Sequence, residues 1–254
     1  MIANADPSPM NTYLSLIENA KQLVKIPVIA SINCYSAENW IPVVKKIEAA
    51  GADAIELNLF YIPSDKDFTS LDYERIYFEI AIKMKITVGI PFSVKLSPSF
   101  TNLPYVVDQL YYRGASGVVL FNRPYEPDID IDHIKFRAAE VLSLPSDLRP
   151  TLKWVAFVSS QVDDIDVAAA SGIHSSEDVI KLLLAGAKAV QLCSVIYKNG
   201  PEYITTLLEE LKIWMANHHF EQIEDFRGKI NYKNIGNLAM QERAQFMRYF
   251  TELE

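Results

Sequence analysis

The sequence predicts an α/β protein built on a parallel β-sheet that is covered by helices. Short runs rich in Val and Ile recur along the chain, and each is followed by a turn and a stretch with helical spacing of apolar residues. The repeat is roughly 30 to 40 residues long, which is the size of one strand–helix unit. Strands that alternate with helices in this way lie parallel and are buried on both faces.

Two architectures satisfy this pattern, an eight-stranded barrel and an open doubly wound sheet. No strand is followed by Gly-x-Gly-x-x-Gly, and the chain has no Gly-Lys-Ser/Thr loop. These are the signatures of nucleotide binding on open sheets. The sequence therefore favours a TIM (β/α)8-type barrel.

Each predicted element follows from local signals. The first strand is nearly all apolar, and Ser36 and Gly51 then mark the start and end of the next helix. The predicted strands are 27–33, 54–60, 92–97, 117–122, one of 154–158 and 167–170, and 189–193. The predicted helices are 11–24, 36–50, 73–86, 103–112, 133–142, 175–185 and 201–217. Because 154–158 and 167–170 lie too close for a helix between them, one is expected to be an accessory strand.

The count of units is two short of a closed barrel. About six strand–helix units are present, whereas a closed barrel has eight, and an open sheet exposes unpaired strand edges. We expect an N-terminally incomplete barrel whose Met1 is an internal residue of a longer gene product. The expected domains are a (β/α) barrel over 1–220 and a C-terminal helical extension over 221–254.

Composition excludes several classes of protein. Half of the 254 residues are hydrophobic and the net charge is -8, which argues against disorder, nucleic-acid binding and a polybasic membrane patch. The two cysteines, Cys34 and Cys193, form neither a disulfide framework nor a cysteine-rich zinc site, and are expected to be small core residues. No histidine pair has metal-ligand spacing, and no signal peptide or spanning segment is evident. We expect a cytoplasmic protein without a metal, whose partners are small molecules or other chains.

Polar residues end four of the predicted strands: Asn33, Asn58, Lys95 and Asn122. Active sites of barrels lie at these carboxyl ends. Lys95 interrupts an apolar strand, where an unpaired ammonium is costly, so it must meet Glu56 of the neighbouring strand or a ligand. We favour the ligand. Asn58 and Asn122 either contact a ligand or tie loops to the backbone.

The last two units suggest a phosphate site. Ser171 and Gly172 close one strand, the segment 175–178 opens the next helix, and Cys193 and Ser194 close the following strand. Small residues and a helix N-terminus favour an anion at this end of a barrel. The alternative is that Ser175 or Ser176 is only a helix cap and Gly172 only a turn.

Five segments carry a resemblance to a known family. They are Pro27-Val-Ile-Ala-Ser-Ile, Gly51-Ala-Asp-Ala-Ile-Glu-Leu-Asn58, Phe92-Ser-Val-Lys95-Leu-Ser-Pro, Gly172-Ile-His-Ser-Ser-Glu-Asp-Val and Leu184-Ala-Gly-Ala-Lys-Ala-Val-Gln-Leu-Cys-Ser, and the match ends at Asp225-Phe-Arg-Gly-Lys. The chain resembles the dihydroorotate dehydrogenase family of FMN-dependent barrels, and more closely the shorter dihydroorotate dehydrogenase-like proteins. The family's first two strands have no counterpart here.

The resemblance implies roles for these residues. Lys95 would contact the flavin ring and stabilise its reduced form, and Asn58 and Asn122 would hold flavin and a pyrimidine substrate. The pairs Ser171–Gly172 and Cys193–Ser194 would surround the FMN phosphate. The implied activity is oxidation of dihydroorotate, or of a related dihydropyrimidine, in pyrimidine biosynthesis.

One motif departs from the family. Where the family has Asn-Leu-Ser-Cys-Pro-Asn, or serine as the base, this chain has Asn58-Leu-Phe-Tyr-Ile-Pro63, which puts Tyr61 at the position of the catalytic base. A tyrosine with a pKa of about 10 is a weak base at neutral pH. The alternatives are a flavin-dependent reductase with Tyr61 as proton donor and a non-catalytic barrel that binds a phosphorylated ligand. The electron acceptor is not indicated, and apolar surface beside the missing strands leaves room for a homo-oligomer.

Overall fold

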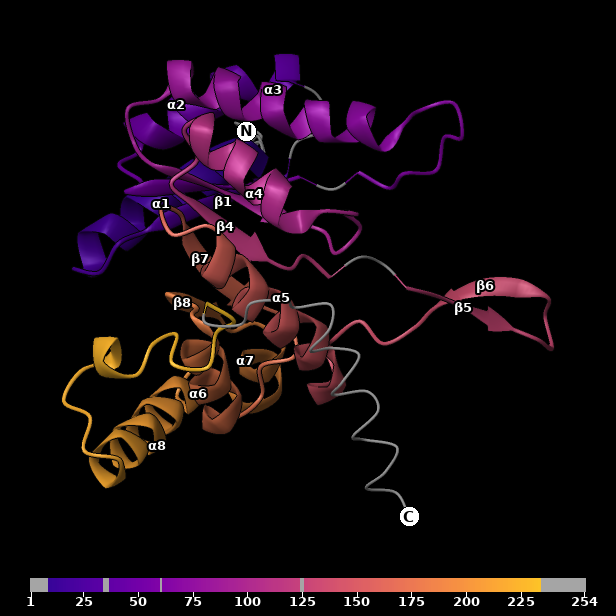
Figure 1. Ribbon diagram of the computed structural model, residues 1–254. Helices are drawn as coiled ribbons and strands as arrows, with labels where there is room; N and C mark the ends of the chain where they lie inside the picture. The colour runs from indigo at the N-terminus through magenta and orange to yellow at the C-terminus, as the bar shows by residue number, and fades with distance from the viewer. Residues whose placement is uncertain (1–8, 34–36, 60, 124–125, 234–254) are drawn as a thin grey trace, which may run out of the picture.

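The structure, a computed structural model, describes residues 9–33, 37–59, 61–123 and 126–233 of the chain, without the side chains of 37–39. Six parallel strands form one sheet in the order β1-β2-β3-β4-β7-β8 (Figure 1). They are β1 (Ile29–Asn33), β2 (Ala54–Asn58), β3 (Phe92–Leu96), β4 (Gly117–Leu120), β7 (Asp166–Ala170) and β8 (Ala189–Gln191). The sheet curls into part of a (β/α) barrel, which confirms the predicted fold class and the six strand–helix units.

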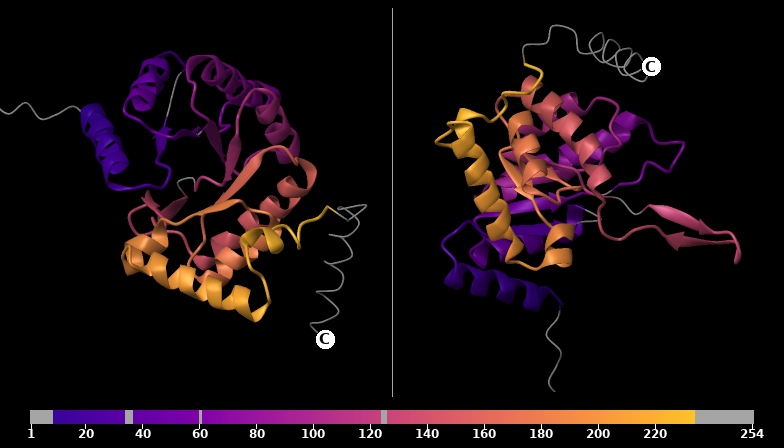
Figure 2. Two further views of the ribbon diagram at one scale, coloured as in Figure 1. Left: turned by 90° about the vertical axis from the view of Figure 1, so that its left-hand side faces the viewer. Right: turned by 90° about the horizontal axis from the view of Figure 1, so that it is seen from below.

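Helices cover the convex face of the curled sheet, as Figure 2 shows. They are α1 (Pro9–Leu23), α2 (Ala37–Ala49), α3 (Ser70–Thr87), α4 (Leu103–Tyr112), α5 (Leu148–Gln161), α6 (Ser176–Ala185), α7 (Ser194–Asn199) and α8 (Tyr203–Asn217). Helices α2 to α6 contact one another in chain order, so they form a continuous outer layer. The short α7 was not predicted.

The two faces of the sheet differ in chemistry. Leu57, Val94 and Leu96 point to the helices and are fully buried. The alternate positions Asn58 and Lys95 are paired in register on β2 and β3, so both side chains point to the concave face. The apolar core therefore lies between sheet and helices, and polar groups gather inside the curl.

The predicted helix over 133–142 is wrong. This segment belongs to an antiparallel hairpin of β5 (Pro127–Asp130) and β6 (Lys135–Ala138), which extends away from the barrel in Figures 1 and 2. Asp128 and Arg137 face each other across the hairpin, with Arg137 Nε 2.6 Å from Asp128 Oδ2. The alternation of Asp and Ile before the turn was the strand signal.

The segment 154–158 is also not an accessory strand. It forms the middle of α5, which connects β4 and the hairpin to β7. The buried side chains Leu148, Thr151, Val155 and Val158 fall on one side of this helix. The fifth strand of the sheet is the other candidate, which the structure bounds as β7.

The segment after α8 packs back onto the barrel. A short 3-10 turn, η2 (Ile223–Asp225), leads to Phe226, which is fully buried. Gly228 N and Ile230 N then donate to the carbonyl oxygens of Leu183 and Leu184 in α6, at 3.0 and 2.9 Å. Most of the predicted helical extension, 234–254, lies outside the described residues. No helix in the described part of the chain combines the length and the apolar character needed to span a membrane.

Candidate active site

A cavity of about 580 Å3 opens at the carboxyl ends of β3, β4, β7 and β8. It brings together six of the residues that the sequence singled out: Lys95, Asn122, Ser171, Gly172, Cys193 and Ser194. Its volume lies within the range of small-molecule and cofactor sites. Asn33, at the end of β1, is exposed and is not among the residues that line the cavity.

Lys95 projects from β3 into a polar network that spans the curl. Its ammonium Nζ donates to Gln191 Oε1 at 2.8 Å and lies 3.6 Å from Glu56 Oε1. Gln191 Nε2 in turn donates to Glu56, and Ser31 Oγ donates to the same carboxylate at 2.8 Å. The side chains of Lys95 and Glu56 are 19% and 6% exposed. The contact with Glu56 that was considered from the sequence is therefore present, and because Lys95 also lines the cavity, its contact with a ligand stays a prediction.

Asn58 and Asn122 form a direct hydrogen bond between β2 and the end of β4. Asn122 Nδ2 donates to Asn58 Oδ1 at 2.7 Å. Asn122 lines the cavity, whereas Asn58 supports it from the side. Asn122 N also donates to Leu96 O at 2.7 Å, so the backbone of this asparagine is fixed as well.

The turn after β7 presents unpaired backbone donors. Ser171 and Gly172 both have left-handed backbone conformations, with φ of 79° and 75°. No acceptor among the described residues takes the backbone N–H of Gly172 or Ile173, although both residues are buried. Buried backbone donors are nearly always paired, so these two call for an acceptor such as an anion or water.

Ser194, at the start of α7, adds a side-chain group to the same wall. Its Oγ accepts a hydrogen bond from Ser143 N at 2.9 Å, which leaves the hydroxyl proton for an acceptor in the cavity. Cys193, next to it, is exposed, so its predicted place in the core is wrong. Cys34 lies outside the described residues.

The N-terminus of α6 is capped by its own side chains, and none of its residues lines the cavity. Ser175 is the N-cap, and its hydroxyl accepts from Asp178 N at 3.2 Å. Asp178 Oδ2 accepts from the backbone N–H groups of His174 and Ser175, both at 3.0 Å. Ser175 is therefore a helix cap, as the alternative reading had it, and the unpaired backbone N–H groups of Gly172 and Ile173 lie just before it in the chain.

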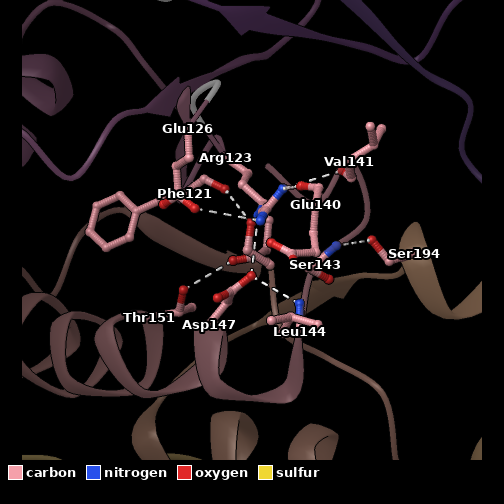
Figure 3. A network of polar contacts seen from close by, with 12 residues as sticks. Phe121, Arg123, Glu126, Glu140, Val141, Ser143, Leu144, Asp147, Thr151 and Ser194 are labelled. Carbon is pink, nitrogen blue, oxygen red and sulfur yellow. Dashed lines mark hydrogen bonds and ion pairs between the residues drawn. The ribbon is translucent and has the colours of Figure 1, made fainter. Parts of the chain in front are cut away.

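Arg123 is a cavity residue that sequence reasoning missed, and Figure 3 shows its contacts. It follows Asn122 and binds the segment 140–147 that forms one lip of the cavity. Its Nη1 donates to Glu140 O at 2.6 Å, and its Nε lies 3.2 Å from Asp147 Oδ2. Asp147 Oδ2 also accepts from Leu144 N at 3.0 Å. The position of Arg123 directly after a strand end was the available signal.

Sequence reasoning also missed Gln191. It interrupts the apolar strand β8 as Lys95 interrupts β3, so the argument used for Lys95 applies to it equally. Only the curl of the sheet brings the two side chains together, because their strands are not neighbours.

The structure places Tyr61 apart from this group. Tyr61 lines a second cavity that shares no lining residue with the first, and its ring lies 5.9 Å from the ring of Tyr77 in an edge-on arrangement. Burial raises the pKa of Tyr77 to about 12.

No described lining residue of the Lys95 cavity is an Asp, Glu or His. Within the described chain, no group of three or more His, Cys, Asp or Glu side chains is placed to hold a metal ion.

Fold and cavity together define a (β/α) barrel protein with a cavity at the carboxyl ends of its strands. The family model for Dihydroorotate dehydrogenase matches residues 8–215. The chain belongs to this family, and it is a dihydroorotate dehydrogenase-like oxidoreductase.

Individual relatives agree with this assignment. The chain is 29% identical over 222 residues to the catalytic subunit of dihydroorotate dehydrogenase B (NAD(+)) of Thermoplasma volcanium, covering 83% of this chain and 70% of the relative. It is 28% identical over 212 residues to dihydroorotate dehydrogenase A (fumarate) of Limosilactobacillus reuteri, covering 81% and 68%. A dihydroorotate dehydrogenase B (NAD(+)) catalytic subunit of Bacillus cytotoxicus is 29% identical over 210 residues, covering 80% and 67%.

Proposed function

We propose that this protein binds FMN in the Lys95 cavity and oxidises dihydroorotate or a closely related dihydropyrimidine. The observation that supports the proposal most strongly is the convergence of six predicted residues on one cavity, with a half-buried cation and unpaired backbone donors in its walls. The family assignment supports the same reading. The names of the relatives suggest NAD+ or fumarate as the class of electron acceptor.

The cavity walls suit the phosphate and the ring system of FMN. The backbone N–H groups of Gly172 and Ile173 and the hydroxyl of Ser194 would hold the phosphate. Lys95 would lie against the ring system, where a positive charge favours the anionic reduced state. Bound flavin would supply a hydride acceptor, which is chemistry that no side chain provides.

Each protein group then has a limited task. Gln191 and Glu56 hold the Lys95 ammonium in place through contacts of 2.8 and 3.6 Å. The hydrogen bond between Asn122 and Asn58 fixes an amide at the cavity wall, where it can orient a ring with hydrogen-bonding edges. We propose Lys95, Asn58 and Asn122 for these flavin and substrate contacts.

No residue of the Lys95 cavity stands out as the proton acceptor. Oxidation of a CH–CH bond removes a hydride from one carbon and a proton from the other, so a base is required. Tyr61 holds the sequence position of the family's base but lines the other cavity. This observation favours a second candidate, a flavin-dependent reductase of another small substrate in which Tyr61 donates a proton after its loop moves.

The visible absorption spectrum of the purified protein tests both candidates, followed by anaerobic addition of dihydroorotate. A flavin spectrum that bleaches on addition is the expected result. A flavin spectrum that does not bleach supports the reductase, for which activated double bonds are the next substrates. A colourless protein that does not take up added FMN overturns the flavin proposal and leaves a barrel that binds another phosphorylated ligand.

A further inference from the structure

A second cavity, of about 270 Å3, lies between the loop after β2, the loop after β3 and the start of α3. Five aromatic side chains line it: Tyr61, Phe68, Tyr73, Tyr77 and Phe100. None of its lining residues belongs to the Lys95 cavity. It is therefore a separate place at which a small molecule can bind.

The lining of this cavity carries negative charge. Glu74 and Asp65 both contribute to it, and no Lys, Arg or His is among its described lining residues. Glu74, on α3, is only 8% exposed. None of the hydrogen bonds and ion pairs between described residues involves its carboxylate, and its oxygen atoms are not fully buried, so they open onto the cavity. A carboxylate on a side chain that is so little exposed is less well solvated than one at the surface, so this site favours a ligand that supplies a hydrogen-bond donor and a positive charge.

The aromatic rings form preorganised walls. Tyr77 packs edge-on against Phe100, with ring centroids 5.1 Å apart, and Phe68 lies 5.6 Å from Tyr73. Tyr73 Oη accepts a hydrogen bond from Asp65 N at 3.2 Å, which ties the loop after β2 to α3. The faces of such rings carry negative potential and attract cations.

We propose that this cavity binds a small organic cation that carries an ammonium group. The ammonium donates hydrogen bonds to Glu74 and lies against the aromatic rings, and its short alkyl part fills the remaining apolar space. Carboxylate and rings favour the same charge, whereas a neutral donor would give Glu74 a weaker hydrogen bond without a charge and an anion would be repelled. The site does not depend on the flavin proposal, because it shares no residue with the Lys95 cavity.

Titration of the protein with butylammonium chloride, followed by ligand-observed NMR, tests the proposal. Butanol serves as the neutral probe of similar shape. We expect butylammonium to bind with a Kd of about 1 mM, and butanol at least about tenfold more weakly. Equal binding of the two probes, or no binding of butylammonium at tens of millimolar, overturns the proposal. Neither readout uses flavin or enzymatic activity.

Variants of the lining residues show whether butylammonium binds in this cavity. Glu74→Gln keeps the shape of the side chain and removes its charge, and we expect it to weaken butylammonium binding about tenfold. Glu79→Gln, an exposed position on the same helix, is the control and should bind as the parent does. Phe68→Leu provides a second test at a half-exposed position, with Phe136→Leu on the exposed hairpin as its control. Unchanged binding in both Glu74→Gln and Phe68→Leu contradicts the assignment.

Discussion

Lys95 and Gln191 are joined across the inside of the curled sheet, with Lys95 Nζ 2.8 Å from Gln191 Oε1. Their strands, β3 and β8, are separated in the sheet by β4 and β7. Glu56 on β2 contacts both side chains, so three strands are linked by one charged network. The network fixes the lysine at the cavity wall and also stabilises the curvature of the sheet.

Removal of the lysine charge should destabilise the fold as well as the site. Lys95→Met leaves Glu56 buried without its cation, and we expect a loss of about 3 kcal/mol in the free energy of unfolding, measured with urea. The double variant Lys95→Met with Glu56→Gln should recover most of this loss, because no uncompensated charge remains. A double variant that is as unstable as Lys95→Met alone would show that the ion pair is not the cause.

Flavin binding gives a separate readout at the same residue. Lys95→Ala should weaken FMN binding and turnover, since the positive charge beside the proposed ring site is lost. Fluorescence titration with FMN measures the affinity directly. A variant that folds and keeps both the parent affinity and turnover places the flavin elsewhere.

Gly172 offers a test of the turn after β7. A methyl group at this position would lie 2.1 Å from Leu148 N, and φ is already left-handed at +75°. Gly51 is a matched control, because its φ is +90° but the nearest atom to an added methyl group is 3.8 Å away. Gly51→Ala should cost about 1 kcal/mol in unfolding free energy from backbone strain. Gly172→Ala should cost at least about 2 kcal/mol more, from the collision. Equal costs would mean that the backbone of Leu148 yields to the added methyl group.

The sheet was predictable because its strands are short, apolar and regularly spaced. Strands such as β2 and β3 have buried side chains toward the helices. The strand ranges predicted from the sequence match the observed bounds of these two strands to within two residues. The candidate site followed from a topological rule, since the carboxyl ends of parallel strands lie at the same edge of the sheet, although Asn33 at the end of β1 lies outside the cavity. Asn122 and Lys95 meet in the cavity for this reason.

The errors also have physical causes. An apolar run of five residues such as 154–158 fits either a strand or a buried helix, and only its extension to Leu148–Gln161 settles the choice. The hairpin over 127–138 makes its pairs between its own two strands, outside the strand–helix repeat, so the repeat gave no guide to it. The bond between Lys95 and Gln191 depends on the curvature of the sheet, which no local pattern encodes.

Removal of the salt bridge between Arg123 and Asp147 should make the lip of the cavity more mobile. Arg123→Met loses the contacts to Glu140 O and Asp147 Oδ2, and we expect the segment 140–147 to be cleaved about tenfold faster in limited proteolysis. FMN affinity should fall as well, because this segment lines the cavity. Arg137→Met, on the exposed hairpin, is the control and should leave the FMN affinity unchanged. Parent-like cleavage and affinity in Arg123→Met would show that the lip is held by other contacts.

The buried phenol of Tyr77 predicts loss of stability at high pH. Burial raises its pKa from 10.0 to about 12, and the ring is only 2% exposed. Below about pH 10 the tyrosine is protonated in both folded and unfolded chains, so its contribution to stability is fully present. Between about pH 10 and 12 the unfolded chain releases the proton while the folded chain keeps it, so the free energy of unfolding falls by up to about 2 to 3 kcal/mol. Tyr77→Phe should remove this part of the pH dependence in urea unfolding, at a cost below about 1 kcal/mol at neutral pH, because the hydrogen bond from the hydroxyl to Leu59 O is long, at 3.4 Å. Tyr112→Phe, at an exposed position, is the control and should keep the parent profile. A Tyr77→Phe protein with the same fall in stability above pH 10 as the parent would assign the effect to other groups.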